Sequence, residues 1–192
     1  MFSKRGLVEL TKSLFKVGIV GTAAVLAVML NLEWRLTLIS IIIAFALILM
    51  VTRRLAEGER LIRAQIPWKW NPRFMLSTGI QGKTLGIVGM GQIGTATARR
   101  GKAFGMEIAY AGRRRADPAL EQELGARFLD LEDLLTTADV VSLHCPLTPE
   151  TRHLITMERL QTMRPTAFLV NTTRGPVIDE AALAAALKDG VI

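Results

Sequence analysis

Cysteine, histidine and aromatic residues are scarce in this sequence, and their scarcity excludes several kinds of site. Cys145 is the single cysteine, the chain holds two histidines, and aromatic residues make up 6% of it. One thiol cannot close an internal disulfide, which is typical of a protein in a reducing cytoplasm. No Cys/His cluster has the spacing of metal ligands, so we predict no metal site. The net charge of +7 is spread out without interleaved aromatic residues, and we therefore predict no nucleic-acid partner.

Long apolar runs occur only near the N-terminus, at residues 17–30 and 36–51. The first run is shorter than the roughly 20 residues that span hydrocarbon, unless flanking apolar residues are included. Basic residues flank the outer ends of both runs, which would place both ends of a hairpin in the cytoplasm. Two interpretations stay open: residues 15–51 insert in a membrane, or they form a pair of buried core helices. No small-x-small cleavage site follows the first run, which argues against a signal peptide.

A glycine-rich segment follows the apolar run 85–88, with glycines at Gly89, Gly91 and Gly94 and a helical pattern over 93–104. In a dinucleotide fold the first glycine permits the tight turn, the second lets a pyrophosphate approach the backbone, and the third lets the helix pack closely. The N-terminus of such a helix offers unpaired N–H groups and a partial positive charge to an anion. The segment therefore predicts a phosphate site.

The remainder of the chain alternates between short apolar runs and helical patterns, as in a doubly wound sheet. Gly190 is expected to end the last helix. We predict an α/β fold with a Rossmann-type, doubly wound parallel sheet, preceded by an N-terminal hydrophobic helical segment. The predicted strands are 85–88, 108–111, 126–128, 140–143 and 167–170, and the predicted helices after the first are 131–138, 157–163 and 179–188.

Three motifs in order, the glycine segment, residues 143–153 (LHCPLTPETRH) and residues 170–183 (VNTTRGPVIDEAAL), resemble the D-2-hydroxyacid dehydrogenases, nearest the glyoxylate and hydroxypyruvate reductases. Residues 45–63, with Trp68 and Trp70, resemble the family's long interdomain helix and tryptophan-proline segment. The resemblance covers about residues 45–192. It implies an interdomain helix and linker at 45–77, a Rossmann domain at 78–192 that is cytoplasmic, a 2-oxo acid substrate, and a homodimer formed through the 45–65 helix.

The resemblance also implies roles for individual residues. The backbone of Gln92 and Ile93 would meet the pyrophosphate of a nicotinamide dinucleotide, and Arg174 would hold the 2-oxo acid, as the catalytic residue. A guanidinium suits that task because it is planar and always charged. The adenosine side would be lined by Cys145 and Pro146, and the nicotinamide side by Thr172 and Thr173. The full predicted cofactor set is Gly89, Gly91, Gln92, Ile93, Gly94, Arg113, Arg114, Cys145, Pro146, Thr151, Thr172 and Thr173.

The end of the second strand predicts which dinucleotide binds. An NAD-binding unit usually places an acidic residue there to accept the ribose hydroxyls. Here Ala111 is followed by Gly112 and three arginines, Arg113, Arg114 and Arg115. Arginines pair with a 2′-phosphate, so NADP(H) should be favoured over NAD(H). The alternative is a solvated basic turn.

Two departures from the family pattern carry expectations of their own. Residues 15–43 resemble the transmembrane helices of ABC-type exporters, without any Gly-x-x-x-x-Gly-Lys-Ser/Thr loop, so the chain resembles a chimera. A membrane-anchored nucleotide-binding protein, a transporter fragment and an artefactual fusion stay open, and removal of residues 1–44 should increase solubility.

The family's catalytic glutamate and histidine segments have no match, since neither His144 nor His153 corresponds to the catalytic histidine. The oxidoreductase is therefore expected to bind dinucleotide with little turnover.

Overall fold

The computed structural model describes residues 42–67 and 71–192, which belong to one compact unit. The expectations about membrane runs, exporter-like helices, Trp68 and Trp70 fall largely or wholly outside these residues. Within the described ranges, no helix combines the length and the apolar character needed to cross a membrane.

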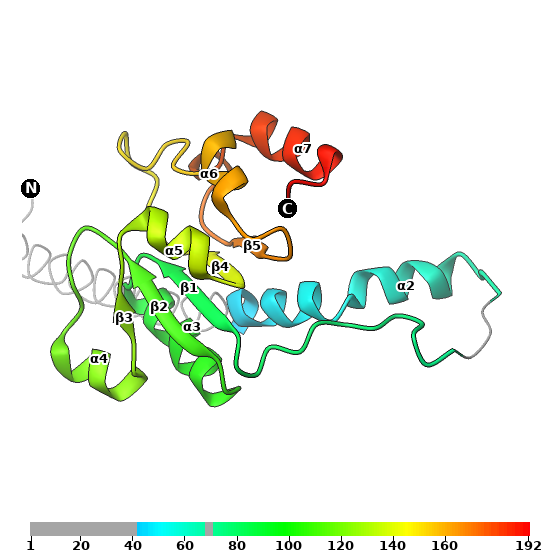
Figure 1. The fold of residues 1–192 in the computed structure, drawn as a ribbon, viewed down its shortest axis with the longest axis horizontal. Coiled ribbons are helices and arrows are strands. Elements are labelled where there is room, and N and C mark those ends of the chain that lie inside the picture. Colours follow the sequence, from blue (N-terminus) through cyan, green and yellow to red (C-terminus); the bar gives the residue numbers. More distant parts are fainter. Residues whose placement is uncertain (1–41, 68–70) are drawn as a thin grey trace, which may run out of the picture. The chain divides into compact units, whose positions relative to one another are not determined.

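A five-stranded parallel sheet forms the centre of the unit (Figure 1). The spatial order is β3-β2-β1-β4-β5, so the order reverses between β1 and β4. In open sheets of this kind, ligands bind beside the carboxyl ends of the strands at such a reversal. The predicted α/β parallel sheet is confirmed, with strands β1 (Thr84–Val88), β2 (Glu107–Ala111), β3 (Arg127–Phe128), β4 (Val140–Leu143) and β5 (Phe168–Asn171).

Helices cover both faces of this sheet. Helix α3 (Gln92–Ala103) packs against β1, β2 and α4 (Pro118–Leu124), whereas α5 (Leu131–Thr137) packs against β1, β2 and α6 (Met157–Thr162). Helix α7 (Glu180–Asp189) packs on α6, and a short 3₁₀ turn, η1 (Gly175–Val177), precedes α7. In Figure 1, α5, α6 and α7 lie on one side of the sheet, and α3 and α4 lie on the other.

The core is divided into two clusters by the sheet. Leu85, Ile87 and Tyr110 belong to the cluster on the α3 face, whereas Val88 and Val141 belong to the cluster on the α5 face. The strands are continuous apolar runs because residues of both orientations are buried, as expected for a parallel sheet covered on both sides. These runs made the strands recognisable in the sequence.

Helix α4 was not predicted, although the sequence contains signals for both of its ends. The side chain of Asp117 accepts a hydrogen bond from the Ala119 N–H at 2.8 Å, and Pro118 begins the helix. Gly125 ends it in the left-handed conformation, with φ of 61°. A capping aspartate, a proline at the first position and a glycine after the last turn together favour a helix. The predicted end of the last helix at Gly190 is confirmed, with φ of 68°.

The helix expected over residues 45–63 is present but is interrupted by a turn at Arg53 and Arg54. Residues 42–52 are helical, Arg54 has φ of 55°, and α2 (Leu55–Arg63) begins after it. The carbonyl of Thr52 accepts a hydrogen bond from the Thr78 N–H at 3.0 Å, so a segment distant in sequence uses an acceptor that a continued helix would need. The break therefore depends on tertiary contacts that helical periodicity does not record.

Candidate functional site

The glycine turn lies where β1 ends, against the end of β4. Gly89 has φ of 99°, a conformation that strongly favours glycine, and its N–H donates to the Ala111 carbonyl at 2.9 Å. A Cβ at Gly89 would lie 2.9 Å from the Cys145 backbone nitrogen. The turn therefore requires glycine both for its conformation and for its approach to the neighbouring strand.

The other two glycines of the motif have different surroundings. A Cβ at Gly94 would lie 2.2 Å from the Gly89 carbonyl oxygen, so α3 is packed directly against the turn. A Cβ at Gly91 would meet no protein atom within 4 Å. Gly91 thus borders open space, as the approach of a pyrophosphate requires. Gly94 lies in a close packing contact, as the role predicted for the third glycine requires.

The N-terminus of α3 faces this turn without a competing anion. Gly91 is the N-cap, no side chain caps the helix, and its first turn contains no acidic residue. The first amides of a helix have no intrahelical acceptor, and the helix dipole makes this end partly positive. The backbone of Gln92 and Ile93 therefore fits a pyrophosphate that enters the space beside Gly91.

Strand pairing places the predicted site residues together at the carboxyl ends of the parallel strands. Val88 is paired with Ala111 on one side and with Leu143 on the other, and Leu143 is paired with Asn171. The residues immediately after these strand ends are those predicted from the sequence. The structure thus brings together Gly89, the arginines after Gly112, the pair Cys145 and Pro146, and the pair Thr172 and Thr173.

The two residues that follow β4 are held in uncharged forms. The Nε2 atom of His144 shares a hydrogen bond of 2.9 Å with the buried Ser142 hydroxyl, and burial lowers the pKa of His144 to about 4. Cys145 is buried as well, and this burial raises the pKa of its thiol. Both side chains are neutral near pH 7, and their geometry suits a packing role.

Thr151 holds the loop after β4 together. Its hydroxyl donates to the Pro146 carbonyl at 2.6 Å and accepts the Thr148 N–H at 2.8 Å. The hydroxyl is therefore already engaged by the loop itself. Its predicted contact with the cofactor stays a prediction, and the observed bonds give Thr151 a loop-shaping role.

Asn171, which the sequence analysis did not single out, organises the loop after β5. Its side-chain oxygen accepts the N–H and the hydroxyl of Thr173, at 2.9 and 2.7 Å, and its amide donates to the Arg174 carbonyl at 3.0 Å. Asparagine commonly fixes a turn through its own side chain in this way, so its position at a strand end was an available signal. Arg174 is exposed, and its guanidinium donates to the Thr173 carbonyl at 3.0 Å.

The arginine turn after β2 is exposed, and its three guanidinium groups are in different surroundings. Arg115 pairs with Glu121, with a distance of 2.9 Å from Nε to a carboxylate oxygen. Hydrogen bonds from the Thr148 hydroxyl and its own backbone, together with the charge of Arg113, lower the pKa of Glu150. Within residues 42–67 and 71–192, Arg113 and Arg114 form no ion pair.

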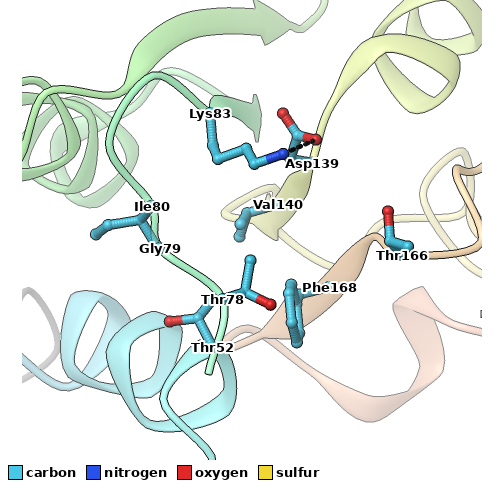
Figure 2. Close-up of a pocket in the computed structure, with 9 residues that line it drawn as sticks. All are labelled: Thr52, Thr78, Gly79, Ile80, Lys83, Asp139, Val140, Thr166 and Phe168. Atoms are coloured by element: carbon cyan, nitrogen blue, oxygen red, sulfur yellow. Dashed lines mark ion pairs between the residues drawn. The ribbon is translucent and has the colours of Figure 1, made fainter. Parts of the chain in front are cut away.

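A cavity of about 210 Å³ lies at the opposite, amino edge of the sheet (Figure 2). Lys83 points to Asp139 across it, with 3.5 Å between Nζ and Oδ1. Asp139 also accepts the Thr84 N–H at 2.9 Å and pairs with Arg164 at 2.9 Å. The Asp139 carboxylate is thus satisfied by groups of the protein itself, and the cavity lies at the opposite ends of the strands from the glycine turn.

The reversed strand order, the glycine turn and the uncapped helix together define a dinucleotide-binding domain of the Rossmann class. Residues 45–192 match the family described as D-isomer specific 2-hydroxyacid dehydrogenase, NAD binding domain. The chain belongs to this family. The matched residues are those over which the sequence resembles the D-2-hydroxyacid dehydrogenases.

Named relatives agree with this assignment. The chain is 49% identical over 155 residues to the glyoxylate reductase of Thermococcus litoralis and 51% identical over 151 residues to that of Korarchaeum cryptofilum, in each case over 78% of this chain. It covers 46% and 45% of those two proteins. The crystal structure of a glyoxylate reductase from Paecilomyes thermophila has a TM-score of 0.71 at 39% identity, over 80% of this chain and 45% of that one. The chain therefore spans a little under half the length of these relatives.

Proposed function

We propose that this chain supplies the cofactor-binding part of an NADP(H)-dependent reductase of 2-oxo acids. The uncapped N-terminus of α3 beside the open space at Gly91 is the observation that carries the proposal. The amides of Gln92 and Ile93 hold the pyrophosphate in this proposal. The 2′-phosphate is held by Arg113 and Arg114, the adenosine side is lined by Cys145 and Pro146, and the nicotinamide side is lined by Thr172 and Thr173.

The proposed substrate class follows from Arg174 and from the relatives. The guanidinium of Arg174 is exposed next to the loop that Asn171 fixes, and a planar fork of donors matches a carboxylate and an adjacent carbonyl. When bound, the nicotinamide supplies the hydride that reduces the carbonyl carbon. The proposal assigns no proton donor among the described residues: the buried His144 ring is bonded to Ser142, and neither His144 nor His153 corresponds to the family's catalytic histidine.

Titration of the purified chain with each dinucleotide tests the cofactor proposal. We expect NADPH to bind at least about tenfold more tightly than NADH, because charge-assisted hydrogen bonds to the 2′-phosphate are the stronger kind. Replacing Arg113 and Arg114 together with glutamine should weaken NADPH binding by roughly 100-fold and change NADH binding little. Calorimetry or quenching of protein fluorescence measures both dissociation constants.

The matched control for this titration is Arg127→Gln, an exposed arginine on β3. This variant removes one positive charge away from the turn, so it should leave the ratio of the two constants unchanged. Equal or tighter binding of NADH by the wild-type chain would overturn the preference for NADP(H). Binding of neither dinucleotide would overturn the cofactor-binding proposal itself.

We also propose a homodimer, formed through α2 and the segment that follows it. No residue of α2 is buried within the chain, and Leu55, Ile62, Ile66 and Leu76 are each more than half exposed. Exposed apolar side chains gathered on one segment commonly mark a protein interface. The predicted interface over 45–65 needs revision, because Phe45 and Ile48 are buried against this same chain.

Substitution of Ile62, which is 77% exposed, tests the dimer. We expect Ile62→Glu to shift the chain towards monomer by tenfold or more in dissociation constant, because it would place an unpaired charge in an apolar interface. Sedimentation equilibrium measures the change. Leu187→Glu is the control, since Leu187 is a 59% exposed leucine on α7. Equal association of both variants and the wild type would contradict the proposed surface.

A further inference from the structure

A buried tyrosine connects β2 to the arginine turn. The Tyr110 side chain is fully buried on the α3 face of the sheet, and its hydroxyl accepts the Ala116 N–H at 2.7 Å. The same hydroxyl donates to the carboxylate of Glu121. Burial, reinforced by the bond to Glu121, raises the pKa of Tyr110, so the phenol keeps the proton that it donates. The far end of the turn is therefore attached to the core through one hydroxyl group.

Glu121 is the second anchor of the turn. It lies in the first turn of α4, its side chain is only 13% exposed, and it accepts hydrogen bonds from the Arg115 Nε at 2.9 and 3.1 Å. The bonds from Arg115 and Tyr110 lower the pKa of Glu121, so the carboxylate is charged near pH 7. Of the three consecutive arginines, Arg115 is thus committed to the protein's own carboxylate.

The two anchors fix the far end of the turn, and its near end lies beside the glycine turn. The turn begins at Ala111, which is paired with Val88 next to Gly89, and it ends at Ala116, which is held by Tyr110. Arg113 lies near enough to Glu150, in the loop after β4, for its charge to act on that carboxylate. Arg113 and Arg114 are consequently presented from a turn that is fixed at both ends.

We propose that Tyr110 and Glu121 are positioning residues for cofactor selectivity, because they hold Arg115 away from the 2′-phosphate and fix the turn that presents Arg113 and Arg114. This inference rests on the proposed NADP(H) function. A fixed turn pays less ordering entropy when it binds the phosphate, so the benefit falls on NADPH and not on NADH.

Two variants that leave the net charge unchanged test the inference. Tyr110→Phe keeps the aromatic ring in the core and removes only the hydroxyl. The double variant Glu121→Gln with Arg115→Gln removes the ion pair and keeps the net charge of the chain. We expect each to weaken NADPH binding roughly five- to tenfold, the effect of about one hydrogen bond to a charged group. NADH binding should change less than twofold.

The selectivity ratio separates positioning from general stability. A variant that only loosened the fold would weaken both dinucleotides together, and thermal unfolding of each variant measures that loss independently. Because the 2′-phosphate is the only difference between them, 2′,5′-ADP and 5′-AMP should show the same contrast as the two dinucleotides. Hydrogen exchange at Ala116 in the Tyr110→Phe variant should be faster than in the wild type.

The outcomes distinguish this inference from the proposed function. If the wild type prefers NADPH and both variants keep the wild-type ratio, the positioning role is wrong and the cofactor proposal stands. If the wild type shows no preference for NADPH, the cofactor proposal fails and the inference fails with it. A lowered ratio in both variants, with NADH binding retained, supports the positioning role.

Discussion

Replacing Gly94 with alanine is expected to abolish measurable dinucleotide binding and to lower the free energy of unfolding by about 3 kcal/mol. In an ordinary helix position, alanine would instead add up to about 1 kcal/mol of stability relative to glycine. At Gly94 the new Cβ would lie 2.2 Å from the Gly89 carbonyl oxygen and 3.1 Å from the Ile87 side chain. The first contact is with backbone, so α3 must move away from the glycine turn.

Gly91→Ala is the matched control, because the same methyl group added three residues earlier meets no protein atom within 4 Å. This variant should unfold within about 0.5 kcal/mol of the wild type. Its dinucleotide affinity should still fall by tenfold or more, since the methyl group occupies the space assigned to the pyrophosphate. Urea denaturation and dinucleotide titration measure the two properties separately. If Gly94→Ala were as stable as Gly91→Ala, the close packing of α3 on the turn would be wrong.

Much of the sheet could be predicted because most of its strands are short apolar runs that can be recognised in the sequence. Residues 85–88 and 140–143 are short apolar runs, and the observed strands β1 and β4 differ from them by at most one residue. The glycine motif was equally informative, because each glycine has a steric role that spacing alone suggests. The open surroundings of Gly91 and the closed surroundings of Gly94 agree with those roles.

Features that depend on contacts between distant segments could not be predicted. The break before α2 requires the Thr78 N–H to reach the Thr52 carbonyl. The role of Tyr110 requires α4 to bring Glu121 within hydrogen-bonding distance of the Tyr110 hydroxyl. The residues next to Tyr110 in the sequence do not predict that contact. The sequence presents Arg113, Arg114 and Arg115 as consecutive residues, and only the fold shows that Arg115 is paired with Glu121.

Asp139 is another residue whose importance only the fold reveals. It lies in the turn between α5 and β4, and the Thr84 N–H at the start of β1 donates to it at 2.9 Å. Lys83 and Arg164 approach the same carboxylate from two other segments (Figure 2 shows the lysine). One carboxylate thus joins the amino ends of β1 and β4 to the turn before β5, and its side chain is only 14% exposed.

Replacing Asp139 with alanine should therefore lower the free energy of unfolding at pH 7 by about 2 to 3 kcal/mol, because the Thr84 N–H and two cations lose their acceptor. Asp139→Asn retains an acceptor oxygen and should cost less. The exposed Asp130, whose side chain caps no amide of α5, provides the control, and Asp130→Ala should change stability by less than about 0.5 kcal/mol.

The cost of Asp139→Asn should also depend on pH in a defined direction. Partial burial acts to raise the pKa of Asp139, but the Thr84 hydrogen bond and the charges of Lys83 and Arg164 outweigh it and lower the pKa below its ordinary value of 3.8. The unfolded chain therefore binds the proton more readily, and the stabilisation is fully present above that ordinary value. It should disappear as the pH falls below 3.8 and through the lowered folded pKa. Urea denaturation of wild type and variant from pH 7 to pH 3 measures the difference, and a gap that stays constant down to pH 3 would show that the carboxylate charge contributes nothing at this junction.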